Sequence, residues 1–265
     1  MIFAAGLGTR LRPLTDHMPK AMVKVGERPL LWHVIMKLQA AGFERIVVNV
    51  HHFAEQIEEY LKENDNFGLD IRISDEREML LETGGGIRKA IPLLDPDAPV
   101  LIHNVDILSN IDLADFYQAC GESEAEACLL VSRRNTKRYL LFGADHRMKG
   151  WTNIQTGEVK PSREILEKEC VKYLAFSGIH ILKPSLFSLL ETWPQRFPIM
   201  DFYIQNCGQH FFEGKEYTNL QLIDVGKINI LEEVEKWVTR QQKNYLICNI
   251  QFPYIPKHAT KNHHS

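Results

Sequence analysis

The chain opens with a short apolar run that leads directly into a loop rich in glycine and basic side chains. Residues 1–5 are typical of a buried first strand in a parallel sheet. The loop at 6–15 reads Gly-Leu-Gly-Thr-Arg-Leu-Arg-Pro-Leu-Thr, and Pro-Lys follows, ending at Lys20. Glycine lets backbone N–H groups approach an anion closely, and Arg10, Arg12 and Lys20 add fixed positive charge. We therefore expect this strand-to-loop junction to bind a nucleoside triphosphate.

The sequence at 6–15 does not match either of two common phosphate-binding motifs. A Walker loop needs a Gly-Lys-Ser or Gly-Lys-Thr triplet, which the sequence lacks. The dinucleotide fingerprint needs a third glycine where this chain has Leu11. The remaining alternative is an ordinary glycine-rich turn with surface arginines nearby. The complete string, with a lysine ten residues after Arg10, favours the phosphate site over that turn.

The string and the later Pro-Lys pair resemble the signature of the sugar-1-phosphate nucleotidyltransferases, also called nucleoside-diphosphate-sugar pyrophosphorylases. That signature is G-x-G-T-R-L-x-P-x-T followed by P-K. Further matches follow in order at residues 81–87, 104–106, 176–179 and 223–226, so the resemblance covers about residues 1–240. The segments Leu-Glu-Thr-Gly-Gly-Gly-Ile and Phe-Ser-Gly-Ile look most like the N-acetylmuramate-1-phosphate uridylyltransferase branch. Short mannose-1-phosphate guanylyltransferases are similar as well.

The resemblance implies an α/β fold with a Rossmann-like mixed, mostly parallel sheet flanked by helices. The alternation of apolar runs and helical patterns agrees with it. Helices are expected at 29–41, 53–63, 112–120, 184–190, 198–207 and 228–243, and strands at 45–50, 69–74, 100–103, 127–132, 139–144, 172–182 and 217–223. We expect a single domain over 1–245, with a nucleotide-binding half at 1–110 and a sugar-binding half at 111–245. Residues 246–265 form a polar tail that we expect to be partly disordered.

Bulk properties limit the partners and the compartment. A net charge of −3 over 265 residues gives no reason to expect a nucleic-acid or membrane surface. No apolar stretch approaches the length of a membrane span, and the first apolar run is too short for a signal peptide. We expect a cytoplasmic monomer or small homo-oligomer. The five cysteines, at 120, 128, 170, 207 and 248, form no C-x-x-C pair, so we expect them to be reduced and structural.

The resemblance also implies a chemistry. An oxygen of a sugar 1-phosphate attacks the α-phosphorus of a nucleoside triphosphate in line, and pyrophosphate leaves. The nucleophile is already an anion, so the main problem is to neutralise charge. Mg²⁺ is the implied cofactor, held between Asp106 and Asp224, each of which follows a predicted strand. The alternative for either aspartate is to cap the segment that follows it.

Individual roles follow from the same resemblance. Arg10, Lys20 and Asp106 are the expected catalytic residues: Arg10 binds the triphosphate, and Lys20 bridges the α-phosphate and the sugar phosphate. The expected nucleotide-binding residues are Ala5, Gly6, Gly8, Thr9, Arg10, Glu82, Thr83 and Gly84. The last three belong to a glycine-rich segment interpreted as a base-reading loop, with a flexible turn as the alternative. The expected sugar-binding residues are Asn104, Ser177 and Gly178, although Ser177 also fits a buried strand serine.

Two positions depart from the family pattern. Val105 stands where glycine is usual and restricts the backbone beside Asp106. Lys24 stands where proline is usual and adds positive charge. Two alternatives to uridylyl transfer to N-acetylmuramate 1-phosphate therefore stay open: guanylyl transfer to mannose 1-phosphate, and a catalytically silent relative that binds nucleotide or sugar. The presence of all four charged residues of the expected site favours an enzyme.

Overall fold

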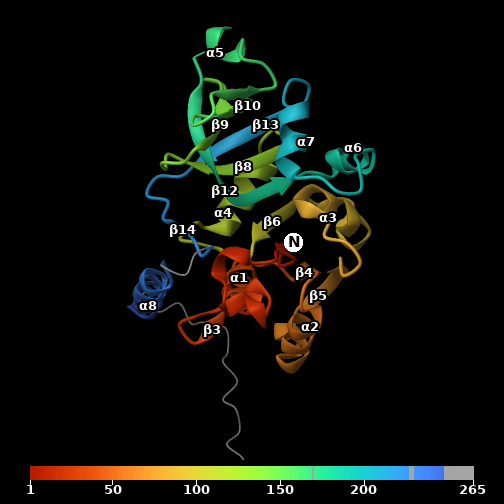
Figure 1. Cartoon of the computed structure of the whole chain (residues 1–265), viewed down its shortest axis with the longest axis vertical. Coiled ribbons are helices and arrows are strands. Elements are labelled where there is room, and N and C mark those ends of the chain that lie inside the picture. The colour runs from red at the N-terminus through yellow and green to blue at the C-terminus, as the bar shows by residue number, and fades with distance from the viewer. Residues whose placement is uncertain (169, 227–229, 248–265) are drawn as a thin grey trace, which may run out of the picture.

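A mixed β-sheet with helices on both faces forms the centre of the computed structural model (Figure 1), which describes residues 1–168, 170–226 and 230–247. The strands of this sheet lie in the order β11-β10-β9-β12-β6-β1-β4-β5, and β8 pairs with both β12 and β13. Their bounds are β1 (Ile2–Phe3), β4 (Arg45–Val50), β5 (Asp70–Asp75), β6 (Val100–Asn104), β8 (Ala127–Ser132), β9 (Arg138–Phe142), β10 (Met148–Asn153), β11 (Glu158–Lys160), β12 (Lys172–Leu182) and β13 (Phe212–Glu216).

The helices and the two small sheets complete the architecture. The helices are α1 (Leu30–Ala40), α2 (Ala54–Glu63), α3 (Glu82–Ala90), α4 (Leu113–Gly121), α5 (Ile165–Lys168), α6 (Phe187–Glu191), α7 (Ile199–Asn206) and α8 (Leu231–Ile247). One small sheet pairs β7 (Ile107–Ser109) with β14 (Leu222–Asp224), and the other pairs β2 (Lys24–Val25) with β3 (Arg28–Pro29). Within the described ranges, none of these helices has both the length and the apolar character of a membrane span.

The sequence prediction of a mixed sheet flanked by helices is confirmed, but the parallel share is smaller than predicted. Strands β6, β1, β4 and β5 are parallel, and α1, α2 and α3 connect them in βαβ fashion. Strand β12 then runs antiparallel to β6, β8 and β9, and β10 runs antiparallel to β9 and β11. Among the described strand pairs of this sheet, antiparallel ones are therefore in the majority.

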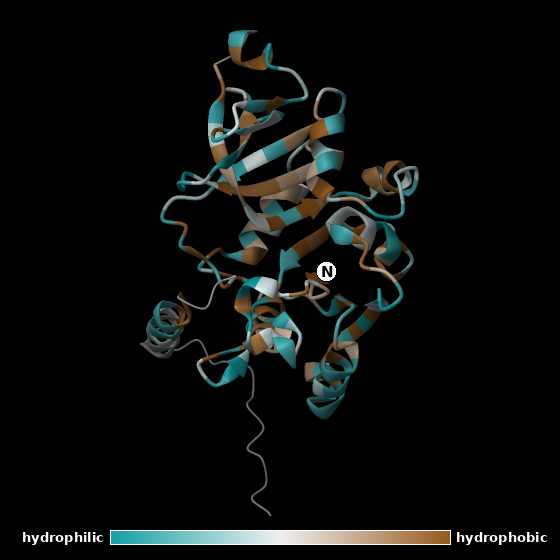
Figure 2. Ribbon diagram, viewed as in Figure 1, coloured by the Kyte–Doolittle hydropathy of each residue, from teal (hydrophilic) through white to brown (hydrophobic). Residues whose placement is uncertain are grey.

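Alternating residues along the parallel strands divide the hydrophobic core between two faces. Ile46 and Val48 of β4 pack on one face with α1, α2 and α4. Val47, between them, packs on the other face with α3, α6 and α7. Figure 2 shows hydrophobic residues along the sheet and hydrophilic residues over the outer surface of α2. Burial on both faces explains why these strands are nearly continuous apolar runs in the sequence.

Local signals in the sequence fix several helix ends. Helix α1 begins after Pro29, and Gly42 follows its end with a φ of 86°, a backbone conformation that favours glycine. Asp112 caps α4, because its Oδ1 accepts hydrogen bonds from the N–H groups of Ala114 and Asp115 at 2.9 and 3.0 Å. The boundaries predicted for these two helices therefore agree with the structure to within two residues.

The predicted strand at 217–223 is wrong in its first five residues. Residues 217–221 form no strand, and β14 begins at Leu222. An unpredicted strand, β13, lies just before them and runs parallel to β8. Its sequence is Phe-Glu-Gly-Lys-Glu, so charged residues hide its strand character. Strand β10, which contains a glycine and a lysine, was likewise not predicted.

The last predicted segments fall partly beyond the described part of the chain. The predicted start of the final helix at 228 lies outside the described residues, as does the predicted tail from residue 248 onward. Residues 246 and 247, the first two of that predicted tail, belong to α8. The final helix is therefore confirmed from Leu231, and it continues past its predicted end at 243.

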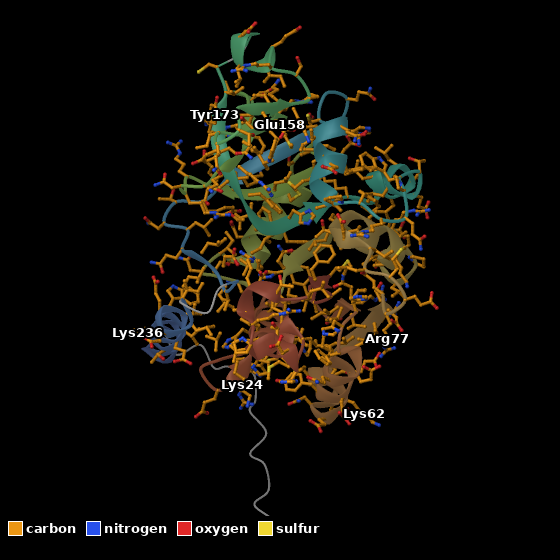
Figure 3. All side chains as sticks on the ribbon, in the orientation of Figure 1. Lys24, Lys62, Arg77, Glu158, Tyr173 and Lys236 are labelled. Carbon is orange, nitrogen blue, oxygen red and sulfur yellow. A yellow bond between two sulfur atoms is a disulfide. The ribbon has the colours of Figure 1, made fainter. Side chains whose placement is uncertain are left out.

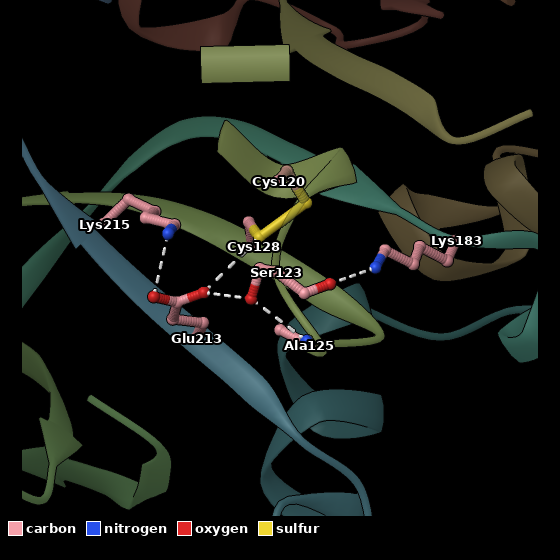
Figure 4. Close-up of a disulfide and its surroundings, with 7 residues drawn as sticks. All are labelled: Cys120, Ser123, Ala125, Cys128, Lys183, Glu213 and Lys215. Atoms are coloured by element: carbon pink, nitrogen blue, oxygen red, sulfur yellow. Dashed lines mark hydrogen bonds and ion pairs between the residues drawn. A yellow bond between two sulfur atoms is a disulfide. The ribbon is translucent and has the colours of Figure 1, made fainter. Parts of the chain in front are cut away.

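The cysteine prediction also needs correction, because Cys120 and Cys128 form a disulfide (Figure 4). Both are buried, and their Cα atoms lie 5.9 Å apart because the chain turns sharply between α4 and β8. The turn is held from β13, where Glu213 Oε2 accepts a hydrogen bond of 2.6 Å from Ser123 Oγ. Cys207 is a buried free thiol whose pKa is raised to about 11 by burial, which fits a structural role. Cys170 is free and exposed, and the fifth cysteine, at 248, lies outside the described residues.

Candidate active site

The loop after β1 is a tight turn held by its own backbone. Gly8 has a φ of 63°, and a Cβ built on it would lie 2.8 Å from Thr15 Cγ2. The Gly8 carbonyl accepts hydrogen bonds of 2.8 Å from both Leu11 N–H and Thr15 Oγ1. A side chain at this position would therefore disrupt the loop. Gly6, in contrast, has no atom within 4 Å of its would-be Cβ, so the loop backbone there faces open space.

The charged residues predicted to form the site are far apart in the sequence, and the fold brings them close together. Lys20, at the start of the 3₁₀ helix η3 (Lys20–Met22), donates from Nζ to Oδ2 of Asp106. Asp224 lies beside Asp106, because β14 pairs with β7 in the register Asp224 to Ile107, and Val225 N–H donates to the Asp106 carbonyl at 2.8 Å. The two aspartates thus reach one place from opposite halves of the chain.

Arg10 joins the same group through the 3₁₀ helix η1 (Thr9–Leu11). A Cβ built on Gly226 would lie 2.6 Å from both Arg10 Nη2 and Asp224 Oδ1. The guanidinium and the carboxylate therefore face the same glycine. Thr9 and Arg10 are both exposed, so their side chains are accessible to a ligand above the loop.

The carboxylate of Asp224 has a buried oxygen that needs a partner. Its Oδ1 is buried and has no hydrogen-bond partner within the described part of the chain. A buried acceptor of this kind is costly unless a cation or a donor meets it. Two aspartates on neighbouring segments suit Mg²⁺, which proteins hold through one or two carboxylates together with substrate phosphates. Among the described residues, no group of three or more His, Cys, Asp or Glu forms a complete protein-only site.

The glycine-rich segment predicted as a base-reading loop is the first part of helix α3. Glu82, with a φ of 63°, begins the helix and pairs with Arg196, Oε1 to Nε, at 3.1 Å. Thr83 Oγ1 accepts a hydrogen bond of 2.9 Å from Ile199 N–H. Gly84 N–H donates to the Phe197 carbonyl at 2.8 Å. The three predicted nucleotide-binding residues therefore contact residues 196–199, which form the end of the loop before α7 and the first residue of that helix.

Close packing explains the three consecutive glycines of α3. A Cβ on Gly84 would lie 2.2 Å from Phe197 Cε2, and one on Gly85 would lie 2.2 Å from the Gln195 carbonyl oxygen. A Cβ on Gly86 would lie 2.8 Å from Glu76 Oε1. All three glycines are buried. Their backbones approach protein atoms within a helix, so the flexible turn given as the alternative does not form, and a part in base recognition stays a prediction.

Two of the three predicted sugar-binding residues are in contact range at the end of β6. Gly178 has a φ of 73°, and its would-be Cβ lies 2.9 Å from Asn104 Nδ2. Asn104 is half-buried. Ser177 is buried, and its Oγ has no hydrogen-bond partner among the described residues. The pairing of β12 with β8 changes register across this stretch, between Phe176 and His180.

The two departures from the family pattern leave the charged group intact. Val105 lies in the turn after β6, packs in the core and donates its N–H to the Phe3 carbonyl at 3.1 Å. Its side chain therefore belongs to the core, with Asp106 next along the chain. Lys24 is exposed in β2, where Figure 3 shows it at the edge of the N-terminal half.

Sequence reasoning missed a buried polar pair under the phosphate loop. Asn49 Oδ1 accepts hydrogen bonds from Ala4 N–H and Ala5 N–H at 2.7 and 3.2 Å. Its Nδ2 donates to Glu76 Oε1 at 2.8 Å. Ala5, predicted to bind nucleotide, thus already uses its N–H. A signal was available, because Asn49 is the one uncharged polar residue inside the apolar strand β4.

Burial shifts the pKa of several groups near the site. Burial raises the pKa of the Glu76 carboxyl above its ordinary value. Burial lowers the pKa of His103, just before Asn104, to about 3, so its imidazole is neutral at pH 7. Lys37 of α1 is partly buried, which lowers its pKa to about 8, and its Nζ donates to the Ser109 carbonyl at 2.5 Å.

Known proteins are similar to this chain over most of its length. A family model described as nucleotidyl transferase matches residues 1–241. An N-acetylmuramate alpha-1-phosphate uridylyltransferase from Caulobacter vibrioides is 36% identical over 211 residues, which cover 73% of this chain and 81% of the relative. A mannose-1-phosphate guanyltransferase from Kluyveromyces lactis is 41% identical over 210 residues, which cover 76% of this chain and 55% of that protein.

Solved structures share the fold. A UDP-glucose pyrophosphorylase from Acinetobacter baumanii matches with a TM-score of 0.72 at 19% identity, covering 94% of this chain and 98% of that one. At so low an identity, the likeness shows the architecture alone.

Proposed function

The chain belongs to the nucleotidyl transferase family, and from that premise we propose that it transfers a uridylyl group from UTP to N-acetylmuramate 1-phosphate. The general activity, without the identity of the base or the sugar, follows from the family and its relatives: the chain is a sugar-1-phosphate nucleotidyltransferase. One observation carries the assignment to particular residues, namely the convergence of Arg10, Lys20, Asp106 and Asp224. Those residues and their roles are our proposal.

The uridylyltransferase relative supports the choice of substrates. This chain spans 81% of that relative, but about half of the mannose-1-phosphate guanyltransferase, which therefore has a large additional part. Because the guanyltransferase is the more identical of the two over the shared residues, guanylyl transfer to mannose 1-phosphate is the second candidate. We propose that residues 1–110 contact the nucleotide and residues 111–245 contact the sugar.

In the proposed reaction, a phosphate oxygen of the sugar 1-phosphate attacks the α-phosphorus of the triphosphate. A P–O bond forms to that oxygen, the bond to the bridging oxygen of the β-phosphate breaks, and its electron pair leaves with pyrophosphate. No general base is needed, because the attacking oxygen is already ionised. The protein must bring two polyanions together in line and stabilise the negative charge that moves to the leaving group.

The residues of the site divide this task. The backbone around Gly6 and Gly8 holds the triphosphate, and the exposed Arg10 guanidinium binds its outer phosphates. Lys20 Nζ, beside Asp106, lies where the α-phosphate and the sugar phosphate approach each other and lowers their repulsion. The half-buried Asn104 binds a sugar hydroxyl, whereas the Ser177 side chain is buried beneath the site. Enzymes of this family depend on Mg²⁺, which Asp106 and Asp224 would hold and which would neutralise phosphate charge.

The test is pyrophosphate release with Mg²⁺, across four nucleoside triphosphates and a panel of sugar 1-phosphates. We expect turnover with UTP and N-acetylmuramate 1-phosphate, loss of that turnover in Asp106→Asn, and normal turnover in Asp145→Asn. Asp145 is the matched control, because it is an exposed aspartate that pairs with nearby surface cations, Arg147 and Lys149. Turnover with GTP and mannose 1-phosphate would favour the second candidate. Nucleotide binding without turnover on the whole panel would indicate a silent relative.

A further inference from the structure

A buried hydrogen-bond network connects the phosphate loop to the start of α3. Asn49 in β4 accepts from the N–H groups of Ala4 and Ala5, the two residues just before Gly6. Its amide nitrogen donates to Oε1 of Glu76, the residue that follows β5. The other carboxylate oxygen, Oε2, accepts from Leu81 N–H at 3.1 Å, directly before α3.

The network is closed to solvent and tightly surrounded. Asn49 is 2% exposed and Glu76 is 1% exposed. A Cβ on Gly86 would lie 2.8 Å from Glu76 Oε1 and 3.2 Å from Asn49 Nδ2, so α3 covers the pair with bare backbone. The backbone of Glu76 is also fixed, because its N–H donates to the Val50 carbonyl at 2.8 Å. Neither side chain can touch a bound ligand, so any effect on the ligand must act through the backbone that the pair holds.

We propose that Asn49 and Glu76 are positioning residues that fix the spacing between the phosphate loop and the start of α3, and thereby set the affinity for the nucleoside triphosphate. This inference rests on the proposed function. A nucleotide that contacts both segments needs them at one separation, and one buried carboxylate holds them there. A hydrogen bond to a charged group is stronger than one between neutral groups, which makes this link a rigid one.

The donors and acceptors of the network allow a specific test by exchange. In Asn49→Asp, one carboxylate oxygen still accepts from Ala4 and Ala5, but the other faces Glu76 Oε1, so two acceptors meet. In Glu76→Gln, the side chain has a single acceptor oxygen for two donors, the Asn49 amide and Leu81 N–H. In the double variant, the introduced glutamine donates from its amide nitrogen to the introduced carboxylate, and its oxygen accepts from Leu81 N–H. Every partner is then restored, with the negative charge moved across the bond.

The experiment measures the dissociation constant of the Mg²⁺ complex of the nucleoside triphosphate that the wild-type enzyme uses. Calorimetric titration is done without sugar 1-phosphate, well below the unfolding temperature of each variant. We expect each single variant to bind about tenfold more weakly or worse, and the double variant to return to within about threefold of wild type. In steady-state assays, KM for the triphosphate rises in the single variants while KM for the sugar 1-phosphate does not.

The control is Tyr203→Phe, which removes an equally buried hydrogen bond of 2.6 Å to His180 in the other half of the protein. We expect it to lower Tm without changing the dissociation constant. Single variants that lose Tm but bind like wild type would overturn the inference, as would a folded double variant whose loss is the sum of the two single losses. If the double variant does not fold, the dissociation constants of the single variants alone test the inference. A wild-type protein that binds none of the four triphosphates would overturn the proposed function as well.

Discussion

Arg10 and Asp224 approach the same hydrogen atom of Gly226, because a Cβ in its place would lie 2.6 Å from Nη2 of the first and Oδ1 of the second. Because Gly226 has no side chain, the Arg10 guanidinium and the Asp224 carboxylate can both lie against it. The ordinary reason for a glycine, a left-handed backbone, does not apply here, since Gly226 is not among the glycines with positive φ. The need for space at this position leads to the first prediction.

Gly226→Ala is expected to lower kcat/KM by roughly a hundredfold, because the methyl group displaces the guanidinium, the carboxylate or both by an ångström or so. Steady-state pyrophosphate release measures the effect. Gly208→Ala is the control, since its would-be Cβ has no atom within 4 Å. Normal activity in Gly226→Ala would show that Arg10 and Asp224 need not keep their present places.

Lys20→Met is expected to reduce kcat by about 10²–10³-fold, the usual cost of removing one group that stabilises developing charge. Methionine keeps much of the side-chain volume and removes the ammonium that donates to Asp106. Lys62→Met removes an exposed lysine from α2 and serves as the control; Figure 3 shows Lys62 at the edge of the molecule. A kcat within threefold of wild type for Lys20→Met, at about equal KM, would remove Lys20 from the reaction.

Gly84→Ala is expected to destabilise the protein by about 1–3 kcal/mol, because its methyl group would overlap the Phe197 ring. Urea unfolding gives the free energy. A smaller side chain at the contact relieves the overlap, so Gly84→Ala with Phe197→Leu is expected to lose less than the sum of the two single losses. Additive losses would mean that the ring and the glycine do not oppose each other in solution.

The free energy of unfolding is expected to fall as the pH drops below about 6.5, the ordinary pKa of histidine. Burial lowers the pKa of both His103 and His180 to about 3. Between these values the unfolded chain holds more protons than the folded one, so acid favours unfolding by about 1.4 kcal/mol per pH unit for each histidine.

Urea unfolding at several pH values from about 7 to about 5 measures this slope. His180→Gln removes one of the two groups and is expected to reduce the slope by about 1.4 kcal/mol per pH unit. An unchanged slope in that variant would mean that His180 accepts a proton in the folded state as easily as in the unfolded one.

The parallel half of the fold was predictable because its strands are buried on both faces. Such strands are nearly continuous apolar runs, as in β4 and β6, and the helices between them have clear start and stop signals. The antiparallel half was harder. Strand β13 has three charged residues, and two of them have partners far away in sequence: Glu213 accepts from Ser123 Oγ at 2.6 Å, and Glu216 Oε1 pairs with Arg133 Nε at 2.9 Å. Such pairing cannot be read from one local pattern.

The charged residues of the site were predictable individually, whereas the contacts of its supporting residues were not. The motif at 6–15 is enough to predict Arg10 and its loop as part of the site. The role of Asn49, in contrast, depends on which strands lie side by side. The three glycines of α3 show the same limit. A close backbone approach was inferred, but toward a base, whereas Gly84 and Gly85 approach Phe197 and Gln195, more than a hundred residues away in sequence. The disulfide was missed because the chain has five cysteines, an odd number, and they form no C-x-x-C pair.

The pairing of β14 with β7 also means that the candidate site is completed late in synthesis. A chain leaving the ribosome carries the phosphate loop and Asp106 early, but Asp224 only after the antiparallel half has been made. A truncated translation product that ends before β14 therefore has the loop without its second carboxylate. If Asp224 has the role proposed above, we expect such a fragment to be inactive.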